Sequence, residues 1–160
     1  MADWKDEELA RHKAEKERAE QEAKEQKRRA DLIKKNAPRI MQELTAVVTA
    51  EIADYQSKPV YAEDRTLRID FKKDPARGFT VDKKHYPAAS LVCGLHRSGT
   101  SIVYRRSYTR DARSLPQSED GGFDLIVNAN DEVVIGGLEE GSSLSDIAES
   151  LLRPVLRPRV

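Results

Sequence analysis

The 160-residue chain predicts an α+β fold, in which a long charged N-terminal helix precedes a five- or six-stranded, mostly antiparallel sheet. An amphipathic helix and a short C-terminal helix are expected to pack against this sheet. Three patterns support the prediction. Residues 3–35 hold no glycine or proline, residues 40–56 repeat apolar side chains at spacings of three and four, and residues 66–136 carry short alternating runs separated by turn residues.

The first 35 residues predict a charged helical extension. They hold 11 basic and 10 acidic side chains and almost no large apolar ones, so they cannot bury a core of their own. Strong helix formers dominate, and oppositely charged side chains recur four residues apart, as in Glu7–Arg11 and Glu25–Arg29. We therefore divide the chain into this extension, residues 1–35, and one compact α+β domain, residues 36–160.

A weak heptad seam runs along the extension and makes it a candidate partner helix. The seam passes through Leu9, Ala23 and Ala30 at one position and Ala19 and Ile33 at the other, and it continues through Ala37, Ile40, Leu44 and Val47. The candidate partner-helix residues are Leu9, Ala23, Ala30, Ile33 and, outside the seam, Trp4. Lys16 and Gln26 interrupt the seam, and Trp4 has no local apolar neighbour. Two alternatives stay open, a lone solvated helix and a helix that pairs with a second chain or another protein.

The next helix is expected from about Ala37 to Gln56, with one face entering the core. The Asn36-Ala37-Pro38 sequence predicts either a new helix start or a kinked continuation, because proline fits the first turn of a helix but interrupts its interior. Its apolar residues are Ile40, Met41, Leu44, Val47, Val48, Ile52 and Tyr55. Ser57-Lys58-Pro59 is expected to end it.

Strands are predicted at 66–72, from Phe79, and at 89–96, 101–110, 123–128 and 132–136. Gly99 suits the turn of a hairpin, and residues 111–122 read as a flexible polar loop. The last helix is expected over 144–156. Ser143 and Asp146 resemble a capping box at its start, and Pro154 predicts a stop or a kink near its end.

The net charge of the whole chain is zero, but two neighbouring segments carry net charges of opposite sign. Residues 58–116 hold 13 basic and 6 acidic side chains, whereas residues 117–150 hold 9 acidic and no basic ones. Adjacent strands of opposite sign can neutralise each other across a sheet, or one segment can face a charged partner. Because the total charge is zero, internal pairing is the favoured interpretation.

The sharpest binding hypothesis concerns the strand at 101–110. Tyr104, Arg106 and Tyr108 share one face with Arg110 beyond, and Arg105 lies on the other. Aromatic rings interleaved with arginines can stack bases and hold phosphates. Alternatively, the tyrosines turn into the core and the arginines reach acidic residues. A nucleic-acid surface would use these basic residues: Arg105, Arg106, Arg110, Arg113, Lys72, Lys73, Lys83 and Lys84.

Catalytic and metal signals are sparse. The string Gly94–Ser101 resembles the phosphosulfate-binding loop of sulfotransferases, which would imply an anion held at a helix N-terminus. The residues that follow it are β-branched and aromatic, so we predict a hairpin turn here. Cys93 and His96 are three apart and point to opposite faces of a strand, which does not favour a metal site. No cofactor, small-molecule substrate or metal site is predicted.

The same sequence bears on compartment and function. The longest apolar run, residues 88–95, is too short to span a membrane, and residues 1–8 are acidic and polar, so neither a membrane helix nor a secretory signal is expected. With one cysteine, a cytoplasmic location is expected. We expect a non-catalytic interaction or assembly module that self-associates or binds a protein. The alternatives are a nucleic-acid-binding protein and a small enzyme using His85, His96 or Ser98.

Overall fold

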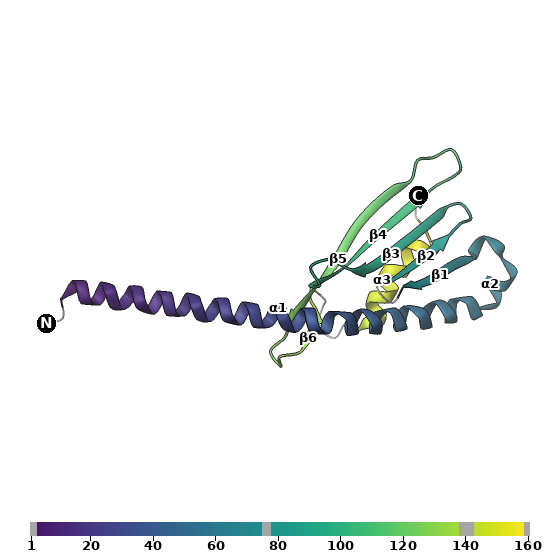
Figure 1. The fold of residues 1–160 in the computed structure, drawn as a ribbon. Helices are drawn as coiled ribbons and strands as arrows, with labels where there is room; N and C mark the ends of the chain where they lie inside the picture. Colours follow the sequence, from purple (N-terminus) through teal and green to yellow (C-terminus); the bar gives the residue numbers. More distant parts are fainter. Residues whose placement is uncertain (1–2, 75–77, 138–142, 159–160) are drawn as a thin grey trace.

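The computed structural model describes residues 3–74, 78–137 and 143–158. Its elements are α1 (Trp4–Ser57), α2 (Pro59–Glu63), a 3₁₀ turn η1 (Arg65–Leu67), β1 (Ile69–Asp74), β2 (Gly78–Lys83), β3 (Ala88–Leu95), β4 (Ser101–Thr109), β5 (Gln117–Val127), β6 (Val133–Ile135) and α3 (Leu144–Leu156). The six strands form one antiparallel sheet in chain order. The second half of α1 and the whole of α3 cover one face of it (Figure 1). The predicted α+β fold is therefore confirmed.

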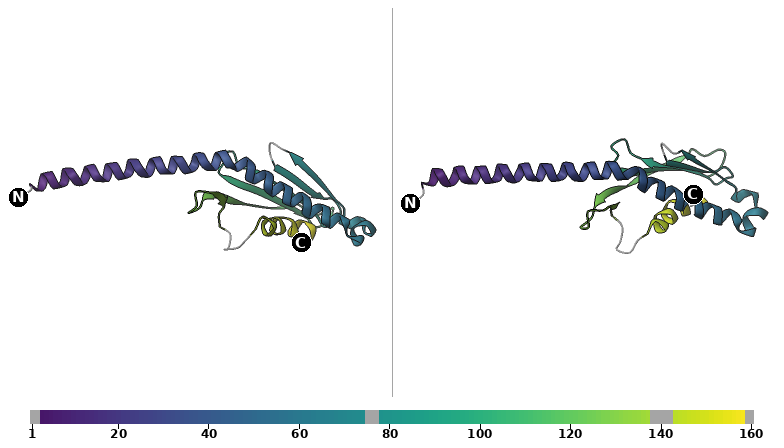
Figure 2. Two further views of the ribbon diagram at one scale, coloured as in Figure 1. Left: turned by 90° about the horizontal axis from the view of Figure 1, so that it is seen from below. Right: turned by 60° about the horizontal axis from the view of Figure 1, so that its bottom comes forward.

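Helix α1 runs unbroken through Pro38, so the kinked continuation is the alternative that the structure adopts. Figure 2 shows the bend where the helix reaches the sheet. Proline lacks the N–H that would bond to the carbonyl of Lys34, and its ring crowds that carbonyl. Helix α1 ends at Ser57 as expected. The short α2 and η1 that follow were not predicted, although Pro59 fits the first turn of α2.

The core lies between the helix face of the sheet and a stripe on each helix. From α1 it takes Ala37, Ile40, Met41, Leu44, Val48 and Ile52, from the strands chiefly Phe79, Val81, Leu91, Cys93, Ile102 and Leu125, and from α3 Ile147, Ala148, Leu151, Leu152 and Val155. The predicted capping box is present at Ser143 and Asp146. Pro154 does not stop α3, which continues to Leu156. The carbonyl of Ser150, which Pro154 cannot reach with an N–H, accepts a hydrogen bond from Arg106 instead.

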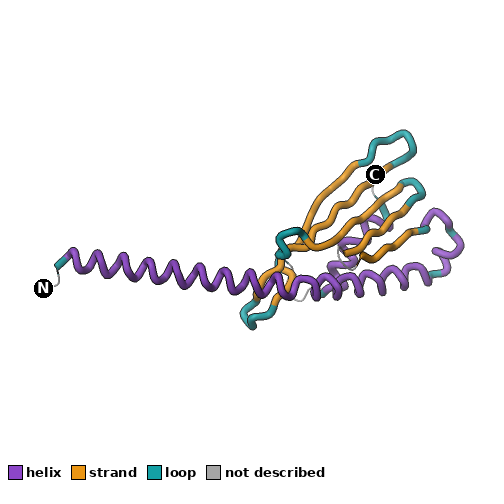
Figure 3. The backbone as a smooth tube through the Cα atoms, in the orientation of Figure 1, coloured by secondary structure: helices purple, strands orange, loops and turns teal. Residues whose placement is uncertain are grey.

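Two strand predictions need correction. Strand β1 begins at Ile69 rather than at residue 66, because η1 occupies Arg65–Leu67. The prediction of a loop over 111–122 is wrong, since β5 begins at Gln117 and residues 117–122 pair with β4. Pairing with β4 overrides their polar, glycine-containing composition. Figure 3 shows the resulting arm, in which β4 and β5 extend past the other strands to the loop at 110–116.

Candidate interaction site

The first turns of α1 form a helix that projects away from the sheet (Figure 1). Every side chain from Asp3 to Lys24 is exposed. Asp3 caps the helix start, with its carboxylate accepting the N–H of Lys5 at 3.4 Å. Charge pairs along the surface add support, since Arg11 lies 3.7 Å from Glu8 and 3.6 Å from Glu15. Over its 24 residues from Trp4 to Lys27, such a helix is about 36 Å long.

A cluster of three charged side chains, here called the clamp, ties this helix to the domain. The Arg28 guanidinium donates to both carboxylate oxygens of Asp131 at 2.9 Å, and to Glu25 at 2.7 and 3.0 Å. Asp131 occupies the β5–β6 turn with φ 62°, where the Asn128 side chain accepts the N–H groups of Asn130 and Glu132. The partners lie 103 residues apart, and no local sequence signal indicates their contact.

The clamp also changes the acidity of its carboxyl groups. Hydrogen bonds from Arg28 and Arg29 lower the pKa of Glu25 to about 2. The hydrogen bond from Arg28 also lowers the pKa of Asp131, and the two carboxylates raise that of Arg28. The three side chains stay 44 to 58% exposed, so the clamp joins the helix to the domain without burying charge.

The structure divides the predicted partner-helix residues into two groups. Trp4 and Leu9 are each 68% exposed, and Ala23 is exposed as well. Ala30 is half-buried, and Ile33 packs against the core. The Lys5 ammonium lies 5.8 Å from the ring centroid of Trp4. The exposed part of the seam therefore ends where the domain begins.

The binding face predicted on β4 points toward the helices. Tyr104 and Tyr108 pack against the core, and Arg106 stacks on the Tyr104 ring at 4.8 Å. The Arg106 side chain is only 12% exposed, and it lies 2.7 Å from Glu119 and donates to the carbonyl of Ser150 in α3 at 3.0 Å. These rings and this guanidinium thus make contacts within the chain.

Tyr108 completes this cluster. Its hydroxyl donates to Glu119 at 2.8 Å. Burial, followed by the hydrogen bond to Glu119, raises the pKa of Tyr108 to about 12. The phenol therefore stays protonated and acts as a fixed donor between β4 and β5.

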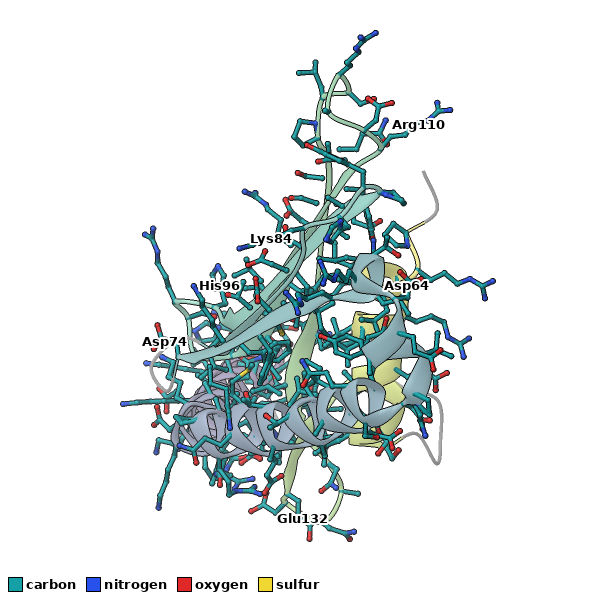
Figure 4. The ribbon with its side chains drawn as sticks, turned by 90° about the vertical axis from the view of Figure 1, so that its right-hand side faces the viewer. Asp64, Asp74, Lys84, His96, Arg110 and Glu132 are labelled. Carbon is teal, nitrogen blue, oxygen red and sulfur yellow. The ribbon has the colours of Figure 1, made fainter. Side chains whose placement is uncertain are left out.

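The other predicted basic residues lie apart from that cluster. Arg105 is on the open face of the sheet, where it donates to Asp120 at 2.7 and 3.2 Å. Arg110 and Arg113 are exposed at the end of the arm, and Figure 4 places Arg110 at the opposite end of the domain from Glu132. Lys83 is 6% exposed, and its ammonium donates to the carbonyls of His85 and Pro87, both at 2.9 Å.

Two of the three residues considered for catalysis, His96 and Ser98, lie in the β3–β4 turn, and His85 lies apart from them, exposed between β2 and β3. His96 Nδ1 lies 3.0 Å from Ser98 Oγ, which lies 2.8 Å from Thr100 Oγ1. The predicted β3–β4 hairpin is confirmed, with Gly99 at φ 70°. His96 and Ser98 are exposed to water, and the Ser98 N–H also donates to His96 Nδ1 at 3.2 Å, so these bonds close the turn. Burial raises the pKa of the Cys93 thiol to about 12.

One concavity lies between α1 and the first two strands, where Lys73, Asp74 and Gly78 line it. Its volume is about 480 Å³, and Met41, Ala46 and Leu95 are among its apolar lining residues. Thr45 and Thr49 also line it, but their hydroxyls donate to the carbonyls of Met41 and Thr45. Among the described residues, no three His, Cys, Asp or Glu side chains gather as metal ligands.

Within the described ranges, no helix combines the length and the apolar character needed to cross a bilayer. Comparisons with protein-family models, with curated proteins and with solved structures return no match. The fold and the surface of this chain are therefore the basis for its proposed function.

Proposed function

We propose that this chain is a non-catalytic assembly module, and that the exposed part of α1 is the element that binds its protein partner. The observation that carries the proposal is a helix exposed from Asp3 to Lys24 and held at its base by the clamp. Such a helix buries no surface of its own chain. Because α1 continues unbroken into the domain, the exposed part is presented as preformed helix, which lowers the ordering cost of binding.

The distribution of charge supports a protein partner. The basic β4 and the acidic first half of β5 neutralise each other directly, through Arg105–Asp120 and Arg106–Glu119. Two of the arginines that a nucleic-acid surface would use are therefore engaged in these pairs. Lys83 is buried, so its ammonium group is not free to contact a phosphate. A lone, buried thiol at Cys93 suits a reducing compartment, so we place the module in the cytoplasm.

The test is a matched pair of variants of the full chain. Ala19→Glu/Ala23→Glu places two charges on the seam, whereas Ala10→Glu/Ala14→Glu places the same charges, at the same spacing, on the opposite side of the helix. Solution mass by light scattering and protein capture from a cell extract are measured for both. We expect the seam variant to lose assembly or capture while the control retains it.

Equal behaviour of the two variants and the wild type in both measurements would reject the proposal. The alternative, nucleic-acid binding by the arm that carries Arg110 and Arg113, predicts a different result. Affinity for single-stranded nucleic acid would fall steeply with salt and would be unaffected by the seam substitutions.

A further inference from the structure

The exposed part of α1 changes in charge from one end to the other. Its tip, residues 3–8, holds four acidic side chains and one basic one. Its base, residues 27–35, holds five basic side chains and one acidic one; Arg28 and Arg29 already pair with Glu25 and Asp131, so the basic charge that faces a partner comes mainly from Lys27, Lys34 and Lys35. Residues 9–25 between them hold five of each sign. The helix is thus acidic at the tip and basic at the base, where it meets the domain.

Apolar side chains are also distributed unevenly along the same helix, which is an observation independent of the charges. Trp4 and Leu9, the two large apolar residues near the tip, are each 68% exposed. At the base, Leu32 and Ile33 are only half-buried against the core. Between residues 10 and 31 the apolar side chains are all alanines. Large apolar side chains therefore lie at the two ends of this helix and not in the middle, exposed at the tip and half-buried at the base.

We propose that two copies of this chain pair through their α1 helices in antiparallel orientation, with the tip of each lying over the base of the other. This inference rests on the proposed function and names its partner as a second copy. In this pairing, each residue lies level with a residue of the other copy such that the two residue numbers add up to about 37. Trp4 of one copy therefore lies level with Ile33 of the other. Opposite charges then meet at both ends of the pair.

Parallel pairing would bring acidic tip against acidic tip and basic base against basic base. At helix-pair separations these charges lie within one Debye length, so the repulsion would act at both ends. The antiparallel arrangement is also two-fold symmetric and uses the same surface on both copies, so it closes as a dimer.

Distances between spin labels on full-length protein test the orientation. Single cysteines replace Glu7 at the tip or Gln21 near the middle, and the wild type is the labelling control because Cys93 is buried. Antiparallel pairing offsets the two labels at position 7 by about 23 residues, or roughly 35 Å along the axis, and those at position 21 by less than about 10 Å. Parallel pairing gives short distances at both positions and would overturn the inference.

A charge-swap experiment tests the cause. Reversal of the tip, Asp6→Lys/Glu7→Lys/Glu8→Lys, is expected to weaken the dimer by roughly tenfold or more at low salt. Adding Lys27→Glu/Lys34→Glu/Lys35→Glu at the base is expected to restore it, since opposite charges again face each other. Helix content, followed by circular dichroism, verifies that each variant is folded. If the tip-reversed protein is folded but its dimer is weakened, and adding the base reversal does not restore the dimer, antiparallel pairing is contradicted.

The outcomes separate this inference from the proposed function. A parallel dimer whose seam variant dissociates would reject the orientation and retain the assembly module. A strictly monomeric wild type whose protein capture depends on the seam would reject the second copy as partner and retain a heterologous one. A monomer whose capture ignores the seam would reject both.

Discussion

Residues 4–36 and residues 37–57 belong to one helix, yet all six buried side chains of α1 come from the second part. In the first part, strong helix formers, the Asp3 cap and surface ion pairs favour helix without tertiary contacts. In the second part, a stripe of apolar side chains at spacings of three and four packs against the sheet. The comparison separates helix formation by local sequence from helix formation by burial.

The difference also explains where function can reside. The second part of α1 is committed to the core, and substitutions on its buried stripe act on the whole domain. The first part contributes only the half-buried Leu32 and Ile33 to the core, at its end, so the surface of its earlier turns can vary for binding without loss of the fold. The first two predictions below make the same change in both parts and expect different results, and the last tests the point where the two parts meet.

The largest expected effect comes from truncating a leucine. Leu44 is 0% exposed, whereas Leu9 is 68% exposed. Leu44→Ala should lower the free energy of unfolding by about 2 to 5 kcal/mol, because it removes buried methyl groups and leaves a cavity. Leu9→Ala should change it by less than about 0.5 kcal/mol. Urea denaturation measures both.

The reactivity of Cys93 gives an independent measure of domain opening. This thiol is buried, and its pKa is raised to about 12, so a thiol reagent reacts when the domain opens. Labelling should be faster in Leu44→Ala and unchanged in Leu9→Ala. Equal acceleration in the two variants would mean that the tip of α1 stabilises the domain, contrary to the comparison.

A smaller effect is expected from replacing an alanine by glycine in each part. Glycine costs about 1 kcal/mol in a helix interior, and loss of a buried methyl group adds a similar amount. Ala37 is 0% exposed, so Ala37→Gly should destabilise the domain by about 1 to 2 kcal/mol. Ala14 is exposed, so Ala14→Gly should lower only the local helix content. Circular dichroism and thermal unfolding distinguish these outcomes.

Hydrogen exchange of backbone amides provides the site-resolved control for this pair. Ala14→Gly should speed exchange around residue 14 and leave the strands unchanged, because the exposed turns open without the domain. Ala37→Gly should speed exchange in the core strands as well. A lower melting temperature of the domain in Ala14→Gly would show that the two parts of α1 unfold together.

The same comparison explains which elements the sequence could predict. The amphipathic stripe of α1, the capping box at Ser143 and the β3–β4 hairpin all depend on local pattern, and all are present. Residues 117–122 were missed because their strand depends on pairing with β4. Gly121 lies directly under Tyr104, and a Cβ there would overlap the tyrosine ring. Nothing in residues 117–122 alone indicates that contact.

The interaction site shows the same limit. The exposed seam and its charge pattern can be predicted from the sequence because they lie along one helix. The clamp is not readable, because Arg28 and Asp131 are distant in sequence and each resembles an ordinary surface charge. The faces of β4 were predicted correctly by alternation. Which face meets α3 depends on packing, and the contact of Arg106 with Ser150 could not be anticipated.

The smallest expected effect is a pH-dependent loosening of the base of the exposed helix. The folded state lowers the pKa of Glu25 from 4.5 to about 2, through hydrogen bonds from Arg28 and Arg29. A carboxyl group with a lowered pKa stabilises the folded arrangement at pH values above its unfolded pKa. That contribution is lost as the pH falls from about 4.5 toward 2. Amide exchange in residues 25–33 should therefore accelerate relative to the core strands in this window.

Arg28→Ala is the matched control, because it removes the main donor to Glu25 and the tie to Asp131 together. In this variant the NMR titration of Glu25 should move toward its ordinary pKa, and exchange in residues 25–33 should already be fast at neutral pH. The core strands should be unaffected, since the clamp lies on the surface. If Arg28→Ala left both the titration and the exchange unchanged, the clamp would not hold the helix. The direction of α1 would then depend on the bend at Pro38 and the contacts of Ile33 alone.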